Sequence, residues 1–129
     1  MWPQILRQSI SLNMSQPFVW GQWDCSFVFD IVRDMTGFDP IQDIRGYSTE
    51  AGALKRLKQA GYTSALDLVE RHFVEIAPAM AQRGDIGYPM TISRELMSPA
   101  IIDGVHAFSK DPSGGVLIPR SSIARAWRV

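Results

Sequence analysis

Apolar side chains in the first half of the chain recur at helical spacing. Trp2, Leu6 and Ile10 fall four residues apart, which predicts a short first helix. A second stripe of apolar residues predicts a helix from about residue 25 to residue 36, with Gly37 as its C-cap. Both stripes are amphipathic, as expected of helices that cover a core.

Two further segments combine a capping residue with a helical stripe. Ser48 or Thr49 can cap a helix over residues 50–60, and Ser64 can start one over residues 65–73. A hydroxyl at an N-cap accepts a hydrogen bond from a backbone N–H that the helix itself leaves free. The first half of the chain therefore predicts four helices.

Beyond residue 73 the apolar runs become short and are separated by Gly, Pro, Asp or Ser, which is typical of strands and turns. Because helices come first and strands second, we predict an α+β fold with the helices packed on a small antiparallel sheet. The length of the chain predicts that residues 1–129 form one domain. The predicted strands lie within the segments VEIA, IGYPM, PAIIDG, VHAFS, GGVLIP and ARAWRV.

Charge and hydropathy exclude several classes of protein. Thirteen basic residues balance thirteen acidic ones without a long run of one sign, so bulk charge predicts no binding to nucleic acid or to an anionic membrane. No stretch approaches the roughly 20 apolar residues that span a bilayer. The N-terminal segment lacks the features of a signal peptide. We therefore expect a chain made and kept in the cytoplasm, unless something other than a secretion signal carries it out.

The cysteine and histidine content limits the chemistry. Cys25 is the one cysteine, which excludes an internal disulfide, and His72 and His106 are the only histidines. These residues form no cluster at zinc-ligand spacing. No motif implies a metal ion or an organic cofactor.

Cys25 is the candidate nucleophile. It follows Asp24, a good N-cap, at the start of the predicted second helix, where free N–H groups and the helix dipole favour a thiolate. The alternative is a small, buried structural cysteine, which is the commoner fate of a lone cysteine. As a carboxylate, Asp24 would oppose thiolate formation.

His106 is the candidate base for Cys25. It lies on a predicted strand, a better place for a base than the helix end that holds His72, which we interpret as structural. Trp20 and Trp23 could line a substrate groove, although tryptophan more often supplies core area.

The stretch PFVWGQWDCSFVFD (residues 17–30) resembles the motif of NlpC-type, papain-like cysteine peptidases. In that family an aromatic-x-Trp-Gly turn leads to Asp-Cys at the start of the nucleophile helix. AQRGDIGY resembles the family's Gly-Asp strand start, and PAIIDGVHAFSKDPSGGVLIP resembles the hairpin that follows. The resemblance covers roughly residues 17–129, with a looser match over 37–80. It implies a papain-like α+β fold.

The chain also resembles a compact variant of this family found in tail modules of bacteriophages and gene transfer agents. The shared features are the WG-x-x-DC start, the segment 45–47 (RGY), the segment 83–85 (RGD) and the ending AWRV. The resemblance implies a virion protein at the distal tail, next to tail hub proteins, with peptidoglycan as substrate. A virion would also carry a peptidase to the cell wall without a signal peptide.

Carried over by residue, the resemblance assigns Cys25 as nucleophile and His106 as the third, orienting group of the triad. The family's general-base histidine would lie near Ser98, where this chain has none. Either His106 has taken over the base role or the triad is broken, since serine does not accept a proton at neutral pH as imidazole does. Two hypotheses follow: a peptidoglycan peptidase, and a catalytically inactive structural component of the tail tip that keeps the peptidase fold.

Overall fold

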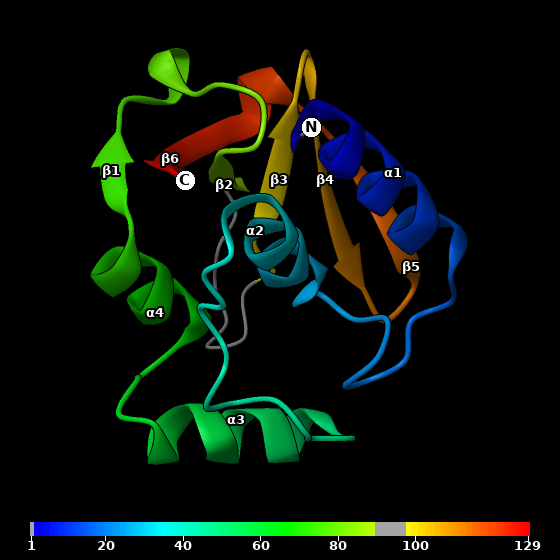
Figure 1. Cartoon of the computed structure of the whole chain (residues 1–129), viewed down its shortest axis with the longest axis vertical. Helices are drawn as coiled ribbons and strands as arrows, with labels where there is room; N and C mark the ends of the chain where they lie inside the picture. The colour runs from blue at the N-terminus through cyan, green and yellow to red at the C-terminus, as the bar shows by residue number, and fades with distance from the viewer. Residues whose placement is uncertain (1, 90–97) are drawn as a thin grey trace.

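The computed structural model of the chain describes residues 2–89 and 98–129. Within these residues four α-helices precede all six strands of the sheet (Figure 1). The helical stripes seen in the sequence are thereby confirmed. The helices are α1 (Trp2–Ser15), α2 (Phe27–Thr36), α3 (Glu50–Gln59) and α4 (Ala65–His72).

Local capping chemistry sets three of the helix ends. The Thr49 hydroxyl accepts a hydrogen bond from the Gly52 N–H, and the Ser64 hydroxyl accepts one from the Asp67 N–H. Gly37 ends α2 in the left-handed region, with φ of 81°. These caps confirm the predictions made from the sequence.

The start of α2 differs from the prediction. The helix begins at Phe27, its N-cap is Ser26, and Cys25 therefore lies in the turn that precedes it. Asp24 is not the N-cap, because its carboxylate is engaged with backbone N–H groups of the turn itself.

The strands form one six-stranded antiparallel sheet in the order β1-β6-β2-β3-β4-β5. This arrangement confirms the α+β prediction. The C-terminal segment AWRV largely belongs to β6, which lies inside the sheet between β1 and β2. The strands are β1 (Val74–Ile76), β2 (Ile86–Pro89), β3 (Ala100–Asp103), β4 (His106–Asp111), β5 (Gly114–Pro119) and β6 (Ile123–Arg128), with short 3-10 turns at Pro78–Met80 and Arg120–Ser122.

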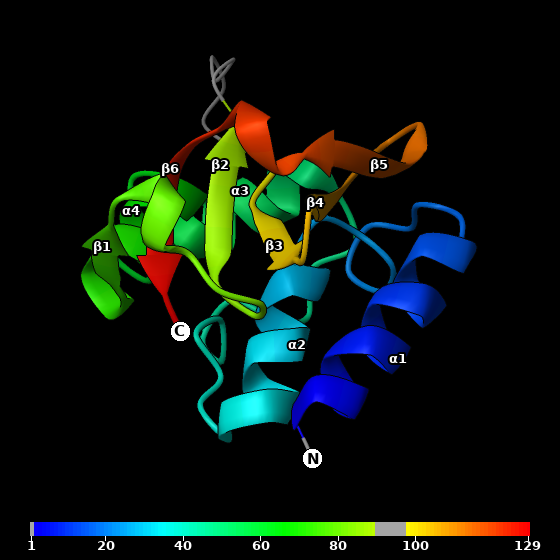
Figure 2. The ribbon, with the colours of Figure 1, turned by 90° about the horizontal axis from the view of Figure 1, so that it is seen from above.

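The two faces of the sheet differ in the size of the side chains that they bury. One face is covered by α1 and α2, which lie side by side against it (Figure 2). On this face large residues such as Phe27, Ile31, Tyr88 and Trp127 form the main core. The opposite face buries a smaller cluster made mostly of alanine and isoleucine. The helical face is therefore the one on which bulky side chains position the candidate site.

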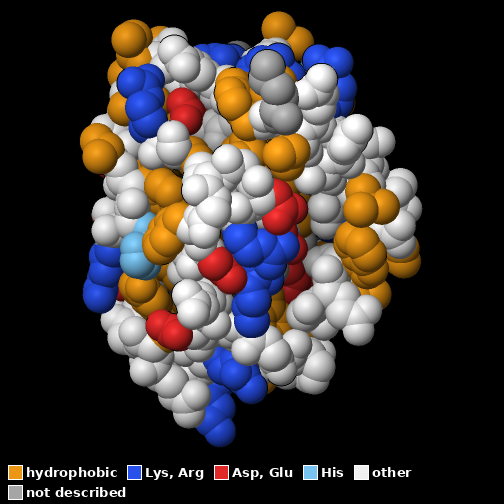
Figure 3. All heavy atoms as spheres, viewed as in Figure 1, with side chains coloured by type: hydrophobic (Ala, Val, Ile, Leu, Met, Phe, Trp, Pro, Cys, Tyr) orange, Lys and Arg blue, Asp and Glu red, His pale blue; other side chains and the backbone are white. Residues whose placement is uncertain are grey.

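No helix within the described residues is long and apolar enough to cross a membrane. On the face drawn in Figure 3, basic and acidic side chains are interspersed and no patch of one sign dominates.

Candidate functional site

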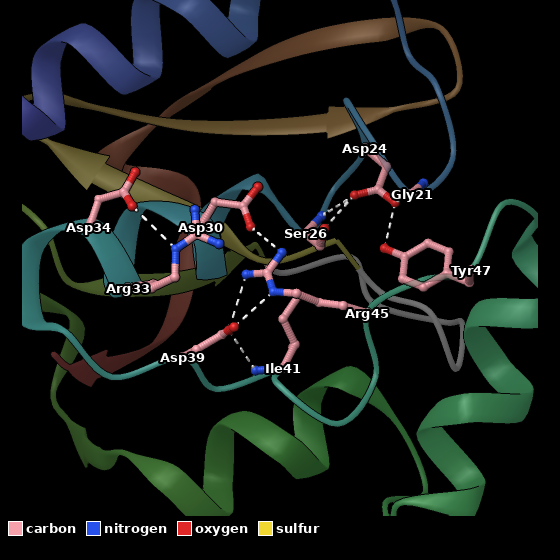
Figure 4. A network of polar contacts seen from close by, with 10 residues as sticks. All are labelled: Gly21, Asp24, Ser26, Asp30, Arg33, Asp34, Asp39, Ile41, Arg45 and Tyr47. Carbon is pink, nitrogen blue, oxygen red and sulfur yellow. Dashed lines mark hydrogen bonds and ion pairs between the residues drawn. The ribbon is translucent and has the colours of Figure 1, made fainter.

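The turn before α2 is organised by one buried carboxylate. Asp24 is 1% exposed. Its Oδ2 accepts hydrogen bonds from the Gly21 N–H at 2.9 Å and the Tyr47 hydroxyl at 2.5 Å. Its Oδ1 accepts from the Ser26 N–H at 2.9 Å and the Ser26 hydroxyl at 2.5 Å (Figure 4). Asp24 thus fixes the backbone on both sides of Cys25.

Gly21 allows the segment 45–47 to approach this turn closely. A Cβ at Gly21 would lie 2.0 Å from the carbonyl oxygen of Tyr47, and the Gly21 φ of +82° is one that side chains rarely adopt. The Tyr47 hydroxyl can therefore reach Asp24 only because residue 21 is glycine.

Arg45, in the same segment, ties this loop to α2. Its guanidinium lies 2.7 Å from Asp30 Oδ1 and 2.8 Å from Asp39 Oδ2, so it bridges two carboxylates (Figure 4). The RGY segment that the sequence singled out is therefore a structural clamp. It holds the loop over the N-terminal end of α2.

Cys25 borders a small apolar cavity between α2, the loop that follows α2, and helices α3 and α4. The cavity has a volume of about 40 Å³, and Trp20, Phe29, Tyr47 and Pro99 are among its lining residues. A buried water occupies roughly 10–15 Å³ on this measure, so the cavity holds a few waters but not a peptide. A peptide substrate would have to displace lining side chains.

The surroundings of Cys25 keep its sulfur protonated. Burial and, to a smaller extent, the adjacent Asp24 carboxylate raise the pKa of the thiol to about 12, and a hydrogen bond with the Ser98 side chain opposes the rise only in part. The opposing effect of Asp24 was expected from the sequence. Proximity to the start of α2 does not outweigh burial, so the free site does not hold a thiolate at neutral pH.

The structure brings Ser98 to Cys25 and does not bring His106 there. In the β3–β4 pairing Asp103 lies opposite His106 and Ile101 opposite Phe108. Continued by two residues, this register places Lys110 opposite Pro99, beside the Cys25 cavity. His106 lies four residues away along β4, which is about 13 Å of strand. The geometry therefore argues against His106 as the base for Cys25.

A sequence signal for this arrangement existed. Asp103-Gly104 starts a tight connection to β4, and Gly104 has φ of +71°. His106 is the first residue of β4 after that connection, so it must lie at the end of the hairpin near the turn. Counting from the turn would have placed Lys110, rather than His106, at the level of Pro99, next to Ser98.

The two tryptophans proposed to line a groove have separate positions. Trp20 lines the cavity beside Cys25 and packs edge-on against Phe18 at 4.8 Å between ring centroids. The Trp23 ring lies 5.9 Å from Nζ of Lys110. Sequence reasoning missed Lys110, because a lysine in a strand normally faces solvent.

The segment 83–85 (RGD) forms the turn before β2. Asp85 is buried and accepts hydrogen bonds from the N–H groups of Gln82 at 2.8 Å and Val129 at 3.0 Å. Arg83 pairs with Asp103 at 2.6 Å. This turn therefore anchors the end of β6 and contributes nothing to the Cys25 cavity.

Metal ligands do not gather at the site. Among the described residues no group of three or more His, Cys, Asp or Glu side chains could hold a metal ion. Among the described residues that line the cavity or hydrogen bond with Cys25, none is a histidine that could take the thiol proton at neutral pH.

The arrangement of helices and sheet is that of an NlpC-type, papain-like domain. The crystal structure of the NlpC/p60 domain of the peptidoglycan hydrolase SagA matches with a TM-score of 0.61 and 17% sequence identity, and the match covers 98% of this chain and 97% of that chain. At this identity the likeness shows the fold alone. No curated protein matches the chain. Over residues 1–129 the chain matches the family described as a domain of unknown function, DUF6950, and it belongs to that family.

Proposed function

We propose that this chain is a component of the tail tip of a bacteriophage or gene transfer agent that keeps a peptidase fold around an unreactive cysteine. The observation that carries the inactive state is the residue that faces Cys25. Ser98 hydrogen bonds with the thiol at the place where a base would stand. Without a base, neither formation of an acyl-enzyme nor its hydrolysis is assisted.

The proposed location rests on the sequence resemblance to tail modules. Its partners would be hub or distal tail proteins, and the virion would carry the chain after synthesis in the host cytoplasm. The clamp of Arg45 and Tyr47 supports a structural role, because it rigidifies the loop over the Cys25 cavity through ion pairs and a hydrogen bond. A small cavity bordered by a clamped loop favours a building block over a peptidase cleft.

Thiol reactivity tests the inactive state. We expect iodoacetamide to alkylate folded Cys25 about a thousandfold more slowly than a free thiol at the same pH, because the thiolate fraction falls tenfold per pKa unit. At about 6 M urea, a concentration that unfolds most small domains, the rate should return to that of a free cysteine. A folded thiol that reacts as fast as the unfolded one would overturn the inactive state.

Particles that carry the Cys25→Ala variant test the structural role. We expect them to assemble and to infect as the wild type does, whereas particles without the chain lack a functional tail tip. Immunogold labelling at the distal tail would locate the protein, and label elsewhere in the particle would contradict the proposal. Loss of infection with Cys25→Ala particles that assemble normally would favour the second candidate.

That second candidate is an active peptidoglycan peptidase. It is favoured by the position of Cys25, which is only partly buried and precedes α2 in a fold shared with the NlpC/p60 domain of SagA. The Cys25 sulfur would attack an amide carbonyl of a stem peptide and form a thioester, the thiol proton would pass to the expelled amine, and water would then hydrolyse the thioester and restore the thiol. Purified sacculi incubated with wild type and with Cys25→Ala decide between the two, by release of new amino groups.

A further inference from the structure

Lys110 is a buried cation without a hydrogen-bond acceptor. It lies on β4 with 0% of its surface exposed, and among the described residues its Nζ has no hydrogen-bond partner. The half-buried Trp23 ring lies 5.9 Å away and offers a cation–π attraction but no lone pair. Leaving an ammonium group dry and unpaired is strongly unfavourable, so this residue calls for a functional explanation.

The neighbouring Asp24 does not supply the hydrogen-bond acceptor that Lys110 lacks. Burial lowers the pKa of Lys110, and the Asp24 carboxylate opposes that change from nearby. However, the two Asp24 oxygens already accept four hydrogen bonds, from Gly21, Ser26 (N–H and hydroxyl) and Tyr47. A carboxylate offers about four lone-pair sites. Asp24 is therefore saturated, and the acceptor for Lys110 has to come from outside the described residues.

Lys110 stands directly beside the candidate site. Continued by two residues beyond the Ile101–Phe108 pair, the β3–β4 register places it opposite Pro99, which lines the Cys25 cavity. Neighbouring strands lie about 4.8 Å apart, so a group bound at Lys110 would adjoin the Cys25 cavity. Trp23 and Pro99 also offer apolar surface to the rest of such a ligand.

We propose that Lys110 and Trp23 form a binding site for the carboxylate of a peptide ligand. The carboxylate accepts hydrogen bonds from Nζ on the side where the Trp23 ring now lies, and the ring packs against the ligand backbone. A monoanion fits better than a phosphate dianion, because a single lysine supplies the positive charge and Asp24 repels a second negative one. This site does not require Cys25 to react, so it can exist whether the chain is a structural component or a peptidase.

The test uses the folded chain with ¹⁵N-labelled tryptophan and a matched ligand pair. N-acetylglycylglycine carries the carboxylate, and its C-terminal amide does not. We expect the acid alone to shift the Trp23 indole resonance saturably, with the resonance assigned from Trp23→Phe. The shift should be lost in Lys110→Met and kept in Lys55→Met, which changes an exposed lysine on α3. An equal response to the amide, or a shift that persists in Lys110→Met, would overturn the site.

Two further measurements, the affinity for acetate and the Tm of Lys110→Met, also test the proposal. Acetate should bind at least fivefold more weakly than the peptide acid, and equal affinity would overturn the peptide part of the proposal. Lys110→Met should fold with an unchanged or higher Tm, because methionine fills a similar volume without an unpaired charge. A lower Tm would mean that Lys110 serves the fold, and would contradict a ligand site.

Discussion

Asp24 and Lys110 are neighbouring buried residues that differ in their hydrogen bonding. Asp24 is 1% exposed and accepts four hydrogen bonds, whereas Lys110 is 0% exposed and has no hydrogen-bond partner among the described residues. A saturated buried charge organises the backbone around it. An unsaturated one costs free energy and is retained only where something else uses it. The comparison separates the charge that organises the loop from the charge whose hydrogen bonds are still unmade.

Removing the saturated charge should have the largest effect. Asp24→Ala leaves the N–H groups of Gly21 and Ser26 and the Tyr47 hydroxyl without their acceptor. We expect the free energy of unfolding to fall by about 3–5 kcal/mol. Urea unfolding measures it, with the exposed Asp43→Ala as control, expected to change by less than about 0.5 kcal/mol. A loss below about 1 kcal/mol for Asp24→Ala would show that the network is not structural.

Two glycine variants separate the effect of a steric clash at residue 21 from the effect of a positive φ alone. Gly21→Ala adds a Cβ 2.0 Å from the Tyr47 carbonyl oxygen at φ of +82°, while Gly37→Ala at φ of +81° meets nothing within 4 Å. We expect a loss of about 3 kcal/mol for the first variant and about 1 kcal/mol for the second. Equal losses would mean that the Tyr47 loop shifts without cost, and that Asp24 holds it only loosely.

Because the folded protein keeps the Cys25 thiol protonated, its stability should fall at alkaline pH. The pKa of folded Cys25 is raised to about 12, whereas an unfolded cysteine titrates near 8.5. Because the unfolded chain loses the proton first, the free energy of unfolding falls above about pH 8.5, by up to about 1.4 kcal/mol per pH unit. Burial also raises the pKa of Tyr47 and Tyr88. These tyrosines contribute only above about pH 10.

Urea unfolding between about pH 7 and pH 10 measures the effect of cysteine ionisation on stability without that of the tyrosines. The decline should appear in the wild type and be absent in Cys25→Ala. A decline of equal slope in both proteins would assign it to another group. It would also remove the evidence that the cavity protects the thiol.

The smallest effect is expected at the far end of β4. His106 is exposed and lies next to the turn, opposite Asp103 in the strand register, whereas Lys110 on the same strand is buried. His106→Ala should change stability by less than about 0.5 kcal/mol and leave the pH profile of Cys25 alkylation unchanged. A change in that profile would restore His106 as a partner of Cys25.

Much of the fold could be predicted because its signals are local. Thr49 and Ser64 cap their helices through N–H groups three residues away, and Gly37 ends α2 with a backbone conformation that glycine adopts freely. The order of helical and strand patterns similarly predicted the α+β class. The sequence-based start of α2 was two residues too early, because the Asp24 carboxylate accepts hydrogen bonds within the preceding turn and does not cap the helix.

Less of the site could be predicted, because it depends on contacts between distant segments. Asp24 and Tyr47 meet only when the loop after α2 folds back over the turn before it. Which residue of β4 faces Cys25 depends on the register of a hairpin, and a strand places residues four apart at points about 13 Å from each other. His106 was therefore a reasonable candidate in the sequence and a distant one in the structure.

The sequence by itself determined the helices, the class of fold and the choice of Cys25 as the residue to examine, because periodicity, caps and motif spacing act over a few residues. Only the tertiary structure decided the chemical state of that residue. Burial among segments that are far apart in the chain raises the pKa of the thiol, and it outweighs the hydrogen bond with Ser98, which lowers that pKa. The hairpin register that brings Lys110 rather than His106 alongside also depends on tertiary structure. The charge of Asp24 acts in the same direction as burial, but it comes from the neighbouring residue and was visible in the sequence.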